Sequence, residues 1–489
     1  MSIDRSIPTA EALAEESYLR RVHPSDWRNP VPKASYDLVI LGGGPCGLAA
    51  AATAVGMGRS VALVERNRIG GNSLNVGSVP SKAIVRSGGA MAAVRDGAEY
   101  GLARIDDPVA DFEAVMARMR GIRTRIAEYH SVERLQSCGI DVFFGAGRFV
   151  GKKTLLVDTQ PLRFKKALIA TGARPRPSDI PGLEQVGYLT STTIFDLLRL
   201  PKRLAIIGGG PLGCEMAQAL ARMGAQVTIL QNEPKFLPHE ERDAAELLSR
   251  ALSRDGVETR LNTTVVGARL QGGEKWVDTV SNGVKFSLAA DQIMLSVGRV
   301  PNIEDLGLEA AAIDFGAAQG IHVDDYLRTS NANVYSAGDV CMQHKFTNVA
   351  QASAQIAVLN AFRLKRRRQS HLLIPWCTYC DPQVAHIGLH VRQARRRAIA
   401  VRSVTIMMQD VDRAITDGQD EGFVKIHVRR GSDEILGASI VAAQAGEMIN
   451  ELSVIMSAGI GMRQLAGILH TYPAQSDAIR LAAVAFMRG

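Results

Sequence analysis

The stretch YDLVILGGGPCG, residues 36–47, decides the fold of this chain. Its first six residues are mostly apolar and predict a short buried strand, which a glycine-rich turn follows at once. In such a turn Gly42 makes the sharp bend, Gly44 lets the backbone approach a pyrophosphate, and Gly47 lets the next helix pack closely on the strand. Free N–H groups and the helix dipole at the start of that helix favour an anion there.

The residues after this turn complete a strand-helix-strand unit. An alanine-rich helix is predicted over residues 48–55, and a second strand over residues 60–64 ends in Glu65. Glu65 is placed to accept hydrogen bonds from an adenosine ribose. The predicted contacts with a dinucleotide are Gly42, Gly44, Pro45, Cys46, Gly47 and Glu65.

The same pattern recurs in LAIIGGGPLG, residues 204–213, which precedes a predicted helix to Ala221 and a strand over 226–230. One glycine fingerprint is weak evidence, because glycine-rich turns are common. Two copies, each between a strand and a helix, indicate two dinucleotide sites. The second site is expected to use Gly208, Gly210, Gly213 and Gln231.

The second strand of this unit ends in Gln231 and Asn232 rather than in an acid or an arginine. An acid would bind a free ribose 2′-hydroxyl and repel a 2′-phosphate, whereas arginine would do the reverse. The sequence therefore leaves NADH and NADPH both open, although the absence of arginine favours NADH slightly.

Composition indicates a globular protein, with 46% hydrophobic and 22% charged residues, and 489 residues allow about three domains of ~150 residues. The net charge of +8 includes short basic runs at 365–368 and 395–397, which are typical of solvated surface, so no nucleic-acid partner is predicted. The chain has neither a signal-peptide pattern nor ~18 uninterrupted apolar residues, so we expect no membrane span and a cytoplasmic location. The six cysteines do not suggest a secreted disulfide framework, and no metal site is predicted.

Several further motifs are more specific than either glycine loop. They are ATG at 170–172, GRVPN at 298–302, YSAGD at 335–339, IPWCTY at 374–379, DRA at 412–414 and the segment 438–447. With these motifs, residues 36–489 resemble the class I pyridine nucleotide-disulfide oxidoreductases, which include dihydrolipoamide dehydrogenase, glutathione reductase and mercuric reductase. The motifs at 374–379 and 412–414 resemble the bacterial mercuric-reductase-like branch in particular.

This resemblance implies an α/β fold with two Rossmann-like dinucleotide-binding domains, one for FAD and one for NAD(P), and a C-terminal α+β dimerisation domain of a homodimer. The FAD-binding domain is expected to be discontinuous, over 34–185 and 318–375, with the NAD(P)-binding domain over 186–317 between its parts. Residues 376–489 would form the interface domain. Residues 1–33 are an N-terminal extension, expected to pack as an extended arm, with no function assigned to it.

The resemblance also assigns roles to individual residues. Lys82 matches the lysine beside flavin N5, where a cation stabilises the reduced ring, and Glu215 matches the glutamate that pairs with it. Pro211 stands where relatives have an aromatic gate over the flavin. Further FAD contacts are implied for Gly147, Thr171, Gly172, Asp339, Thr347 and Ala350, and a further nucleotide contact for Gly298.

The chain departs from the family where the redox-active dithiol belongs. The family segment is GGxCLNVGCxPSK, whereas residues 70–82 read GGNSLNVGSVPSK, so Ser73 and Ser78 replace both cysteines. A serine hydroxyl stays protonated near neutral pH and has no two-electron redox couple, so it cannot form the disulfide relay. Cys377 and Cys380 form a C-x-x-C, but the matching family segment lies away from the flavin, and no redox role is predicted for them.

The family's acid-base pair, a histidine before a proline and a glutamate five residues later, is also changed. Tyr472 and Asp477 occupy these positions, and they would reach the partner's site. Tyrosine, with a pKa near ~10, is a hydrogen-bond donor and a weak acid. Asp477 is expected to hold the Tyr472 hydroxyl, and the neighbouring His470 is expected to be structural. Because these positions differ as well, a natural variant is favoured over serines introduced to inactivate a reductase.

The sequence thus predicts an FAD-dependent NAD(P)H oxidoreductase that passes electrons from reduced flavin directly to a non-disulfide acceptor. A quinone, oxygen, a metal complex and a small electrophile all remain open. One alternative is an enzyme acting on a small molecule between Ser73, Ser78 and Tyr472, whose hydroxyls would polarise it. The others are an inactivated disulfide or mercuric reductase-like enzyme, and a silent flavin-bound regulatory subunit.

Overall fold

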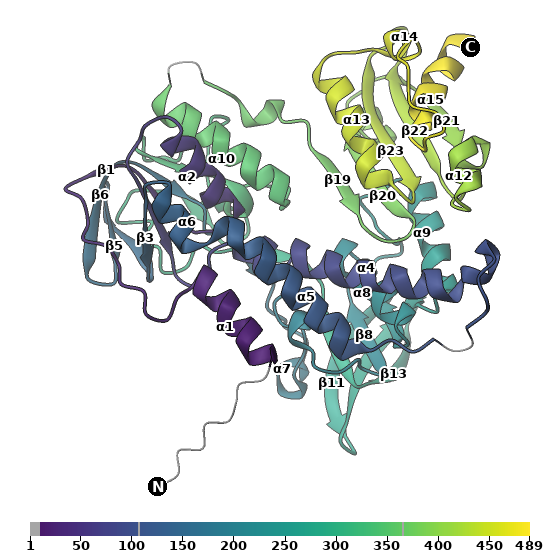
Figure 1. Ribbon diagram of the computed structural model, residues 1–489, viewed down its shortest axis with the longest axis horizontal. Coiled ribbons are helices and arrows are strands. Elements are labelled where there is room, and N and C mark those ends of the chain that lie inside the picture. Colours follow the sequence, from purple (N-terminus) through teal and green to yellow (C-terminus); the bar gives the residue numbers. More distant parts are fainter. Residues whose placement is uncertain (1–9, 106–107, 364–365) are drawn as a thin grey trace.

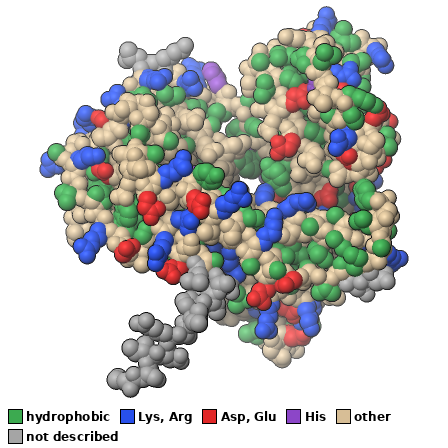
Figure 2. Space-filling model, in the orientation of Figure 1, with side chains coloured by type: hydrophobic (Ala, Val, Ile, Leu, Met, Phe, Trp, Pro, Cys, Tyr) green, Lys and Arg blue, Asp and Glu red, His purple; other side chains and the backbone are tan. Residues whose placement is uncertain are grey.

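The computed structural model describes residues 10–105, 108–363 and 366–489. Three sheet-based bodies are visible in Figure 1. The sheet that contains β1 lies at the left, the sheet around β8 at the lower right, and the C-terminal sheet at the upper right, while the long helices α4, α5 and α8 run across the middle. Lys365, at the start of one predicted basic run, lies outside the described residues. Figure 2 shows basic and acidic side chains intermixed on this face of the molecule.

The first sheet has seven strands in the order β3-β2-β1-β6-β5-β4, with β18 paired to β6. Strands β1 and β2 run parallel, with Leu38 opposite Val61, and α2 connects them. This is the strand-helix-strand unit expected from the first glycine loop. The strands are β1 (Tyr36–Leu41), β2 (Val61–Glu65), β3 (Ile140–Phe144), β4 (Gly147–Gly151), β5 (Thr154–Val157), β6 (Gln160–Ile169) and β18 (Val334–Ser336).

Helices cover this sheet and lead from it to the rest of the chain. α2 packs against α10, which returns to this body from later in the sequence. The helices are α2 (Pro45–Val55), α3 (Gly71–Asn75), α4 (Ser78–Arg95), η1 (Gly97–Tyr100), α5 (Phe112–Ala127), η2 (Glu128–His130), α6 (Val132–Ser137), η4 (Gly338–Val340), α10 (Thr347–Phe362) and η5 (Gln369–His371).

The second unit repeats the parallel arrangement in the order β10-β9-β8-β14, and an antiparallel sheet β11-β12-β13 is attached to it. Its strands are β8 (Arg203–Ile207), β9 (Gln226–Leu230), β10 (Glu258–Arg260), β11 (Thr263–Gln271), β12 (Glu274–Ser281), β13 (Val284–Ala290) and β14 (Gln292–Leu295). Its helices are α7 (Leu183–Val186), η3 (Ile194–Asp196), α8 (Pro211–Arg222) and α9 (Arg242–Arg254). The pair of β7 (Ala173–Pro175) with β15 (Arg299–Pro301) joins the segments that precede β8 and follow β14, whereas β16 (Phe315–Gly316) and β17 (Gly320–Ile321) form a short local hairpin.

The C-terminal body is a five-stranded sheet in the order β19-β20-β23-β22-β21, with α13 and α15 packed on it. Its strands are β19 (Pro375–Thr378), β20 (Gln383–Gly388), β21 (Val401–Met407), β22 (Phe423–Arg429) and β23 (Ile435–Ala442). Its helices are α11 (Val391–Arg396), η6 (Met408–Asp410), α12 (Asp412–Thr416), α13 (Ala445–Ser457), α14 (Met462–Leu465) and α15 (Asp477–Arg488). The chain is therefore an α/β protein with two Rossmann-like units and a C-terminal α+β body, as its sequence predicts. No helix among the described residues is long and apolar enough to cross a membrane.

The close packing of α4 on α8 depends on Gly88. A Cβ at this position would meet the Cα of Ala219 at 2.9 Å and its carbonyl oxygen at 3.0 Å, so only glycine lets the helices approach this closely. The contact joins the first Rossmann-like unit to the second. Because Lys82 lies on α4 and Glu215 on α8, it also determines how these two side chains meet.

The N-terminal extension forms a helix, α1 (Ala10–Val22), rather than the expected extended arm. Tyr18 is fully buried and its hydroxyl donates to the Asn75 side chain. The Arg123 guanidinium lies 4.2 Å from the centre of the Tyr18 ring and forms an ion pair with Glu15. The Val22 carbonyl accepts the Ile69 N–H at 2.9 Å. The helix thus packs on the residues that precede and form α3.

Replacing Tyr18 by phenylalanine should destabilise this part of the chain by ~1–3 kcal/mol, because the buried Asn75 oxygen would lose its donor. Urea unfolding of the FAD-loaded protein, followed by circular dichroism, measures the change. Tyr129, which is 63% exposed, provides the matched control, since its change to phenylalanine should leave the midpoint within error. Equal midpoint shifts for the two variants would contradict the structural role given to Tyr18.

Candidate active site

The Lys82 ammonium and the Glu215 carboxylate form an ion pair, with 2.7 Å between Nζ and Oε2. Glu215 is buried, with 3% of its surface exposed, whereas the Lys82 side chain remains 36% exposed. A buried carboxylate requires a close positive partner, and Lys82 supplies it. The structure therefore brings together two predicted site residues that lie far apart in the sequence. Their catalytic roles stay predictions.

The first strand of the C-terminal body packs directly on this pair. The Tyr379 N–H donates to the other Glu215 oxygen at 2.9 Å, and Lys82 Nζ lies 4.7 Å from the centre of the Tyr379 ring. The C-x-x-C segment is thus closer to the predicted hydride-transfer side than the resemblance implies. Burial, together with the charge of Glu215, raises the pKa of the Cys377 thiol well above its usual value, and burial does the same for Cys380. Both are free thiols, and their raised pKa disfavours the thiolate form that redox chemistry needs.

The serine segment lies on α3 and at the start of α4. Ser73 Oγ accepts a hydrogen bond from Thr347 Oγ1, the first residue of α10, at 3.2 Å. Ser78 begins α4, four residues before Lys82. Asn75 holds the turn between the serines, since its side-chain amide donates to the Gly71 carbonyl at 2.8 Å. The hydroxyls of Ser73 and Thr347 therefore meet where two distant helices begin.

The predicted FAD contacts converge around the first glycine loop. A Cβ on Gly42 would meet the Ala170 carbonyl at 2.3 Å, and one on Gly338 would lie 3.1 Å from the Cys46 Cβ. The ATG and YSAGD motifs therefore lie against this loop. Gly147, at the start of β4, packs against the end of β1, and Ala350 is buried in the first turn of α10.

The residues around the loop fit a bound dinucleotide. Glu65 accepts the Gly43 N–H at 2.7 Å, which orients its carboxylate at the end of β2. Added Cβ atoms at Gly44 and Gly172 would meet no atom closer than 3.6 Å, so the backbone is open to a ligand there. Asp339 is largely buried, which raises its pKa, and Arg299 of the GRVPN motif opposes this with a contact at 3.2 Å.

Arg299 was not among the predicted contacts, although its motif was recognised. Asn302 of the same motif holds the ATG segment, because its side-chain amide donates to the Thr171 carbonyl at 2.8 Å and its carbonyl accepts the Thr171 hydroxyl. The GRVPN motif contains both residues, but the sequence did not show which groups they contact.

The second glycine loop borders a pocket of about 450 Å³. Its lining includes Gly208, Gly210, Gln231 and Gly298, and added Cβ atoms on Gly210 and Gly298 would meet nothing within 4 Å. Gly213 contacts the Gly208 carbonyl as Gly47 contacts that of Gly42. This cradle also fits a dinucleotide.

Gln231 repeats the geometry of Glu65 with a neutral group. Its Oε1 accepts the Gly209 N–H at 2.8 Å, as Glu65 Oε2 accepts that of Gly43. The remaining atom of the Gln231 head group is an amide nitrogen, a donor, where Glu65 has an oxygen. Among the described residues lining this pocket there is no lysine or arginine.

Glu240, which the sequence did not single out, lies in the wall of this pocket and is 8% exposed. Its Oε1 accepts the Trp376 indole N–H at 2.8 Å, while Oε2 is buried and has no hydrogen-bond partner in the described structure. Burial raises the pKa of Glu240 to about 7, and the neighbouring Glu241 adds to this shift while the Trp376 hydrogen bond opposes it.

Glu240 should therefore make stability pH-dependent. Between pH 4.5 and about 7 the folded protein holds a proton that the unfolded chain has released, so the free energy of unfolding falls as pH rises. Glu240→Gln keeps an acceptor for Trp376 and removes the titration. The variant should gain up to ~3 kcal/mol over wild type between pH 4.5 and 8.

Urea unfolding at pH 5 and pH 8 measures this difference. Glu246, whose side chain is 54% exposed, offers a control in Glu246→Gln, which should keep the wild-type pH slope. Parallel slopes for wild type and Glu240→Gln would exclude a titrating Glu240.

Tyr472 and Asp477 do not form the expected pair. The Tyr472 hydroxyl donates to Asp412 Oδ2 at 2.7 Å, whereas Asp477 binds Arg480 at 2.6 and 3.0 Å. The physical reason is that Asp477 begins α15, where the arginine one turn later reaches both of its oxygens. The ring nitrogen Nε2 of His470 lies 2.6 Å from Glu451 Oε1, and its structural role stays a prediction.

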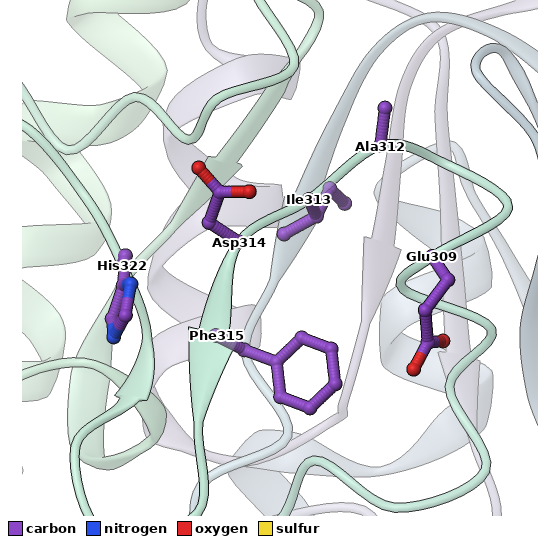
Figure 3. A pocket seen from close by; sticks show the side chains of 6 residues that line it. All are labelled: Glu309, Ala312, Ile313, Asp314, Phe315 and His322. Atoms are coloured by element: carbon purple, nitrogen blue, oxygen red, sulfur yellow. The ribbon is translucent and has the colours of Figure 1, made fainter.

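The larger surface hollow, about 590 Å³, is shallow and lies away from these residues. Figure 3 shows Glu309 at one side and Asp314 and His322 at the other, so their side chains do not converge on one point. Its volume exceeds that of the nucleotide pocket, but it lacks the glycine cradle and the ion pair. Among the described residues, no three His, Cys, Asp or Glu side chains are grouped to hold a metal ion.

Two family models cover most of the chain. Residues 36–355 match the pyridine nucleotide-disulphide oxidoreductase model, and residues 374–483 match the dimerisation domain of the same family. Mercuric reductase of Staphylococcus aureus is 30% identical over 451 residues, covering 92% of this chain and 82% of the relative. Dihydrolipoyl dehydrogenase of Mycobacterium bovis is 31% identical over 455 residues, covering 91% and 97%.

Solved structures give the same result. The Cu(II) complex of the HOCl-induced flavoprotein disulfide reductase RclA from Escherichia coli has a TM-score of 0.82 at 27% identity, covering 93% of this chain and all of that one. A Cu(II) complex of a cysteine-to-serine mutant of RclA has a TM-score of 0.83 at 27% identity, covering 92% and 99%. With its two glycine cradles and the matched models, the chain belongs to the pyridine nucleotide-disulphide oxidoreductase family of FAD-dependent NAD(P)H oxidoreductases.

Proposed function

We propose that this chain is an NAD(P)H-dependent reductase that delivers electrons directly to a metal ion, without a protein disulfide. One observation carries the proposal: the Lys82–Glu215 ion pair is intact, while Ser73 and Ser78 put hydroxyls where the family has thiols. The ion pair proposed to act where electrons enter is therefore kept, and the dithiol that would pass them on through a disulfide is absent.

The first cradle would hold FAD through the glycine loop, Glu65 and Asp339. FAD supplies the chemistry of accepting a hydride from a nicotinamide and releasing its electrons to an acceptor. Lys82 would neutralise negative charge near the ring, and Glu215 would keep the lysine in place. Ser73 and Thr347, linked at 3.2 Å, would line the opposite side of the same space.

The second cradle would bind the nicotinamide nucleotide, with NADH preferred. Gln231 is uncharged, so it does not repel a 2′-phosphate, but the described lining has no lysine or arginine to bind one. The preference should therefore be modest, and both nucleotides should reduce the enzyme.

The acceptor side would be completed in a homodimer. The matched dimerisation model supports this assembly, and Tyr472, which is 73% exposed in the single chain, would then face the partner's serine segment. A metal ion suits this side because its reduction needs no proton, and the site has no histidine in the position of the family's acid. One hydride carries two electrons, enough to convert two Cu(II) to Cu(I) or one Hg(II) to the metal.

The names of several relatives support the choice of a metal. Several relatives are mercuric reductases, and RclA binds Cu(II) in a solved structure even when one cysteine is replaced by serine. Cu(II) is therefore the first acceptor to test, with Hg(II) second.

Anaerobic stopped-flow mixing of the FAD-loaded protein with NADH, and separately with NADPH, tests the input side. Bleaching of the oxidised flavin band with either nucleotide is expected, with no long-wavelength thiolate charge-transfer band. Mixing the reduced protein with Cu(II), Hg(II), a soluble quinone, oxygen or oxidised glutathione then tests the output side. We expect the fastest reoxidation with a metal ion and none above background with glutathione disulfide.

Other outcomes would redirect the assignment. Absence of bleaching with both nucleotides would indicate a silent flavin-bound subunit. Fastest reoxidation by the quinone or by oxygen would replace the metal as acceptor. Rapid reduction of glutathione disulfide would overturn the dithiol-free mechanism itself.

A further inference from the structure

Asp412, at the start of α12, is the acidic residue that contacts Tyr472. The Tyr472 hydroxyl donates to Asp412 Oδ2 at 2.7 Å, and this contact joins the segment before α15 to α12 across 60 residues of sequence. Asp477, the acid expected from the sequence, is held by Arg480. The two aspartates therefore have different partners. The Asp477 carboxylate forms an ion pair with a guanidinium, and the Asp412 carboxylate accepts a hydrogen bond from the Tyr472 phenol.

Arg413 of α12 and Asp417, the residue that follows the helix, compensate each other's charge. Asp417 forms an ion pair with Arg413 at 2.8 Å, and Gln475 donates to Asp417 at 3.3 Å. Two carboxylates act on Tyr472: Asp412, which accepts its hydrogen bond, and Asp477, which is paired with Arg480. Among these carboxylates, Asp412 is the one bonded directly to the hydroxyl.

A phenol has one proton and two lone pairs, so a hydroxyl that donates to Asp412 presents its oxygen as an acceptor to any ligand. The hydrogen bond and the negative charge of Asp412 raise the pKa of Tyr472, and Asp477 adds to the shift. Tyr472 therefore remains protonated near neutral pH and does not act as a proton donor to the ligand. This differs from the histidine of the family, which titrates near neutrality.

We infer that Asp412 is the positioning residue of the acceptor site: it fixes the Tyr472 hydroxyl so that the phenol oxygen faces an electron-poor or cationic acceptor bound at the partner's serine segment. The inference rests on the proposed function for the identity of the acceptor side. It deepens that function by naming the residue that orients Tyr472 and the electronic character the acceptor must have.

Difference spectroscopy near 295 nm tests the contact without any acceptor. The Tyr472 ionisation is obtained by subtracting the alkaline titration of Tyr472→Phe from that of each protein. In Asp412→Ala the pKa of Tyr472 should fall toward the ordinary value of 10.0, because the hydrogen-bonded carboxylate is gone. Asp477→Asn should produce a smaller fall. A larger fall in Asp477→Asn than in Asp412→Ala would overturn the inference, whichever acceptor the enzyme uses.

Reoxidation kinetics test the consequence, with Cu(II) as the probe. The half-saturating Cu(II) concentration should rise about 3- to 10-fold in both Asp412→Ala and Tyr472→Phe, the loss that one hydrogen-bond-scale interaction produces. Reduction by NADH is measured separately in each variant, because the proposal places it on the other side of the site. Asp412→Asn retains an oxygen acceptor for the phenol and should recover most of the wild-type value.

The double variant Asp412→Ala/Tyr472→Phe separates positioning from a general structural effect. If Asp412 acts through the phenol oxygen, the double variant should bind Cu(II) no more weakly than Tyr472→Phe alone. Additive losses would show that Asp412 acts independently of Tyr472 and would overturn the inference. Failure of Cu(II) to reoxidise any of these proteins would instead count against the metal acceptor, and the spectroscopic titration would still decide the role of Asp412.

Discussion

Replacing Lys82 by methionine is expected to slow the reduction of bound flavin by NADH by about 10²- to 10³-fold, the usual loss when one charge-stabilising group is removed. In wild type the ammonium lies 2.7 Å from the buried Glu215 carboxylate, at the point where the family resemblance places flavin N5. Methionine keeps the length of the side chain and removes its charge. The rate is measured by anaerobic stopped-flow at 450 nm, after confirming that the variant still binds FAD.

This substitution also leaves Glu215 without its cation, and an unpaired buried carboxylate destabilises a protein by ~3–5 kcal/mol. The double variant Lys82→Met/Glu215→Gln removes that charge and should recover stability but not rate. Lys165, on the surface and paired with Asp37, offers a control in Lys165→Met, which should reduce flavin at the wild-type rate. Reduction of the Lys82 variant within about threefold of wild type would mean that the ion pair has only a structural role.

Replacing both serines by cysteine is expected to produce the second large effect. The Ser73→Cys/Ser78→Cys variant should show a long-wavelength thiolate-to-flavin band on reduction by NADH, and wild type should not. Disulfide reductase activity, assayed with oxidised glutathione or lipoamide, should rise at least ~100-fold over the wild-type background, since the variant gains the missing nucleophile. Adding Tyr472→His and Asp477→Glu should increase it further, because a titrating acid is then present.

Ser81→Cys is the matched control for this gain. Ser81 lies on the same helix as Ser78 but is 1% exposed, so its thiol would be buried in the protein. It should give neither the band nor the activity. If the double-cysteine variant is equally inactive while binding FAD and accepting electrons, the serine segment does not face the flavin and the proposed acceptor side is wrong.

The Rossmann-like units could be predicted because their signals are local. A glycine at 42 bends the chain, and one at 47 avoids its carbonyl oxygen, where an added Cβ would lie 1.8 Å away. These requirements involve residues that are close together in the sequence, so they can be recognised without a structure. The Lys82–Glu215 pair was predicted as well, although only through resemblance, since 133 residues separate the two.

Other features depend on which segments meet, and the pattern alone did not reveal them. The N-terminal extension forms a helix because Tyr18 finds Asn75 and Arg123 to pack against, partners that lie far away in the sequence. The Asp412 contact was missed for the same reason. Spacing favoured Asp477, but a nearby arginine competes for it.

The sequence by itself determined the fold class, the two nucleotide cradles and the absence of cysteines in the GGNSLNVGSVPSK segment, because each is a property of a short run of residues. Only the tertiary structure decided which acid holds Tyr472, which groups surround Glu215 and why Glu240 holds a proton near neutral pH. These are consequences of burial and of contacts shorter than 4 Å. They arise only when distant segments pack together, which around Glu215 and Glu240 also excludes water from the charges.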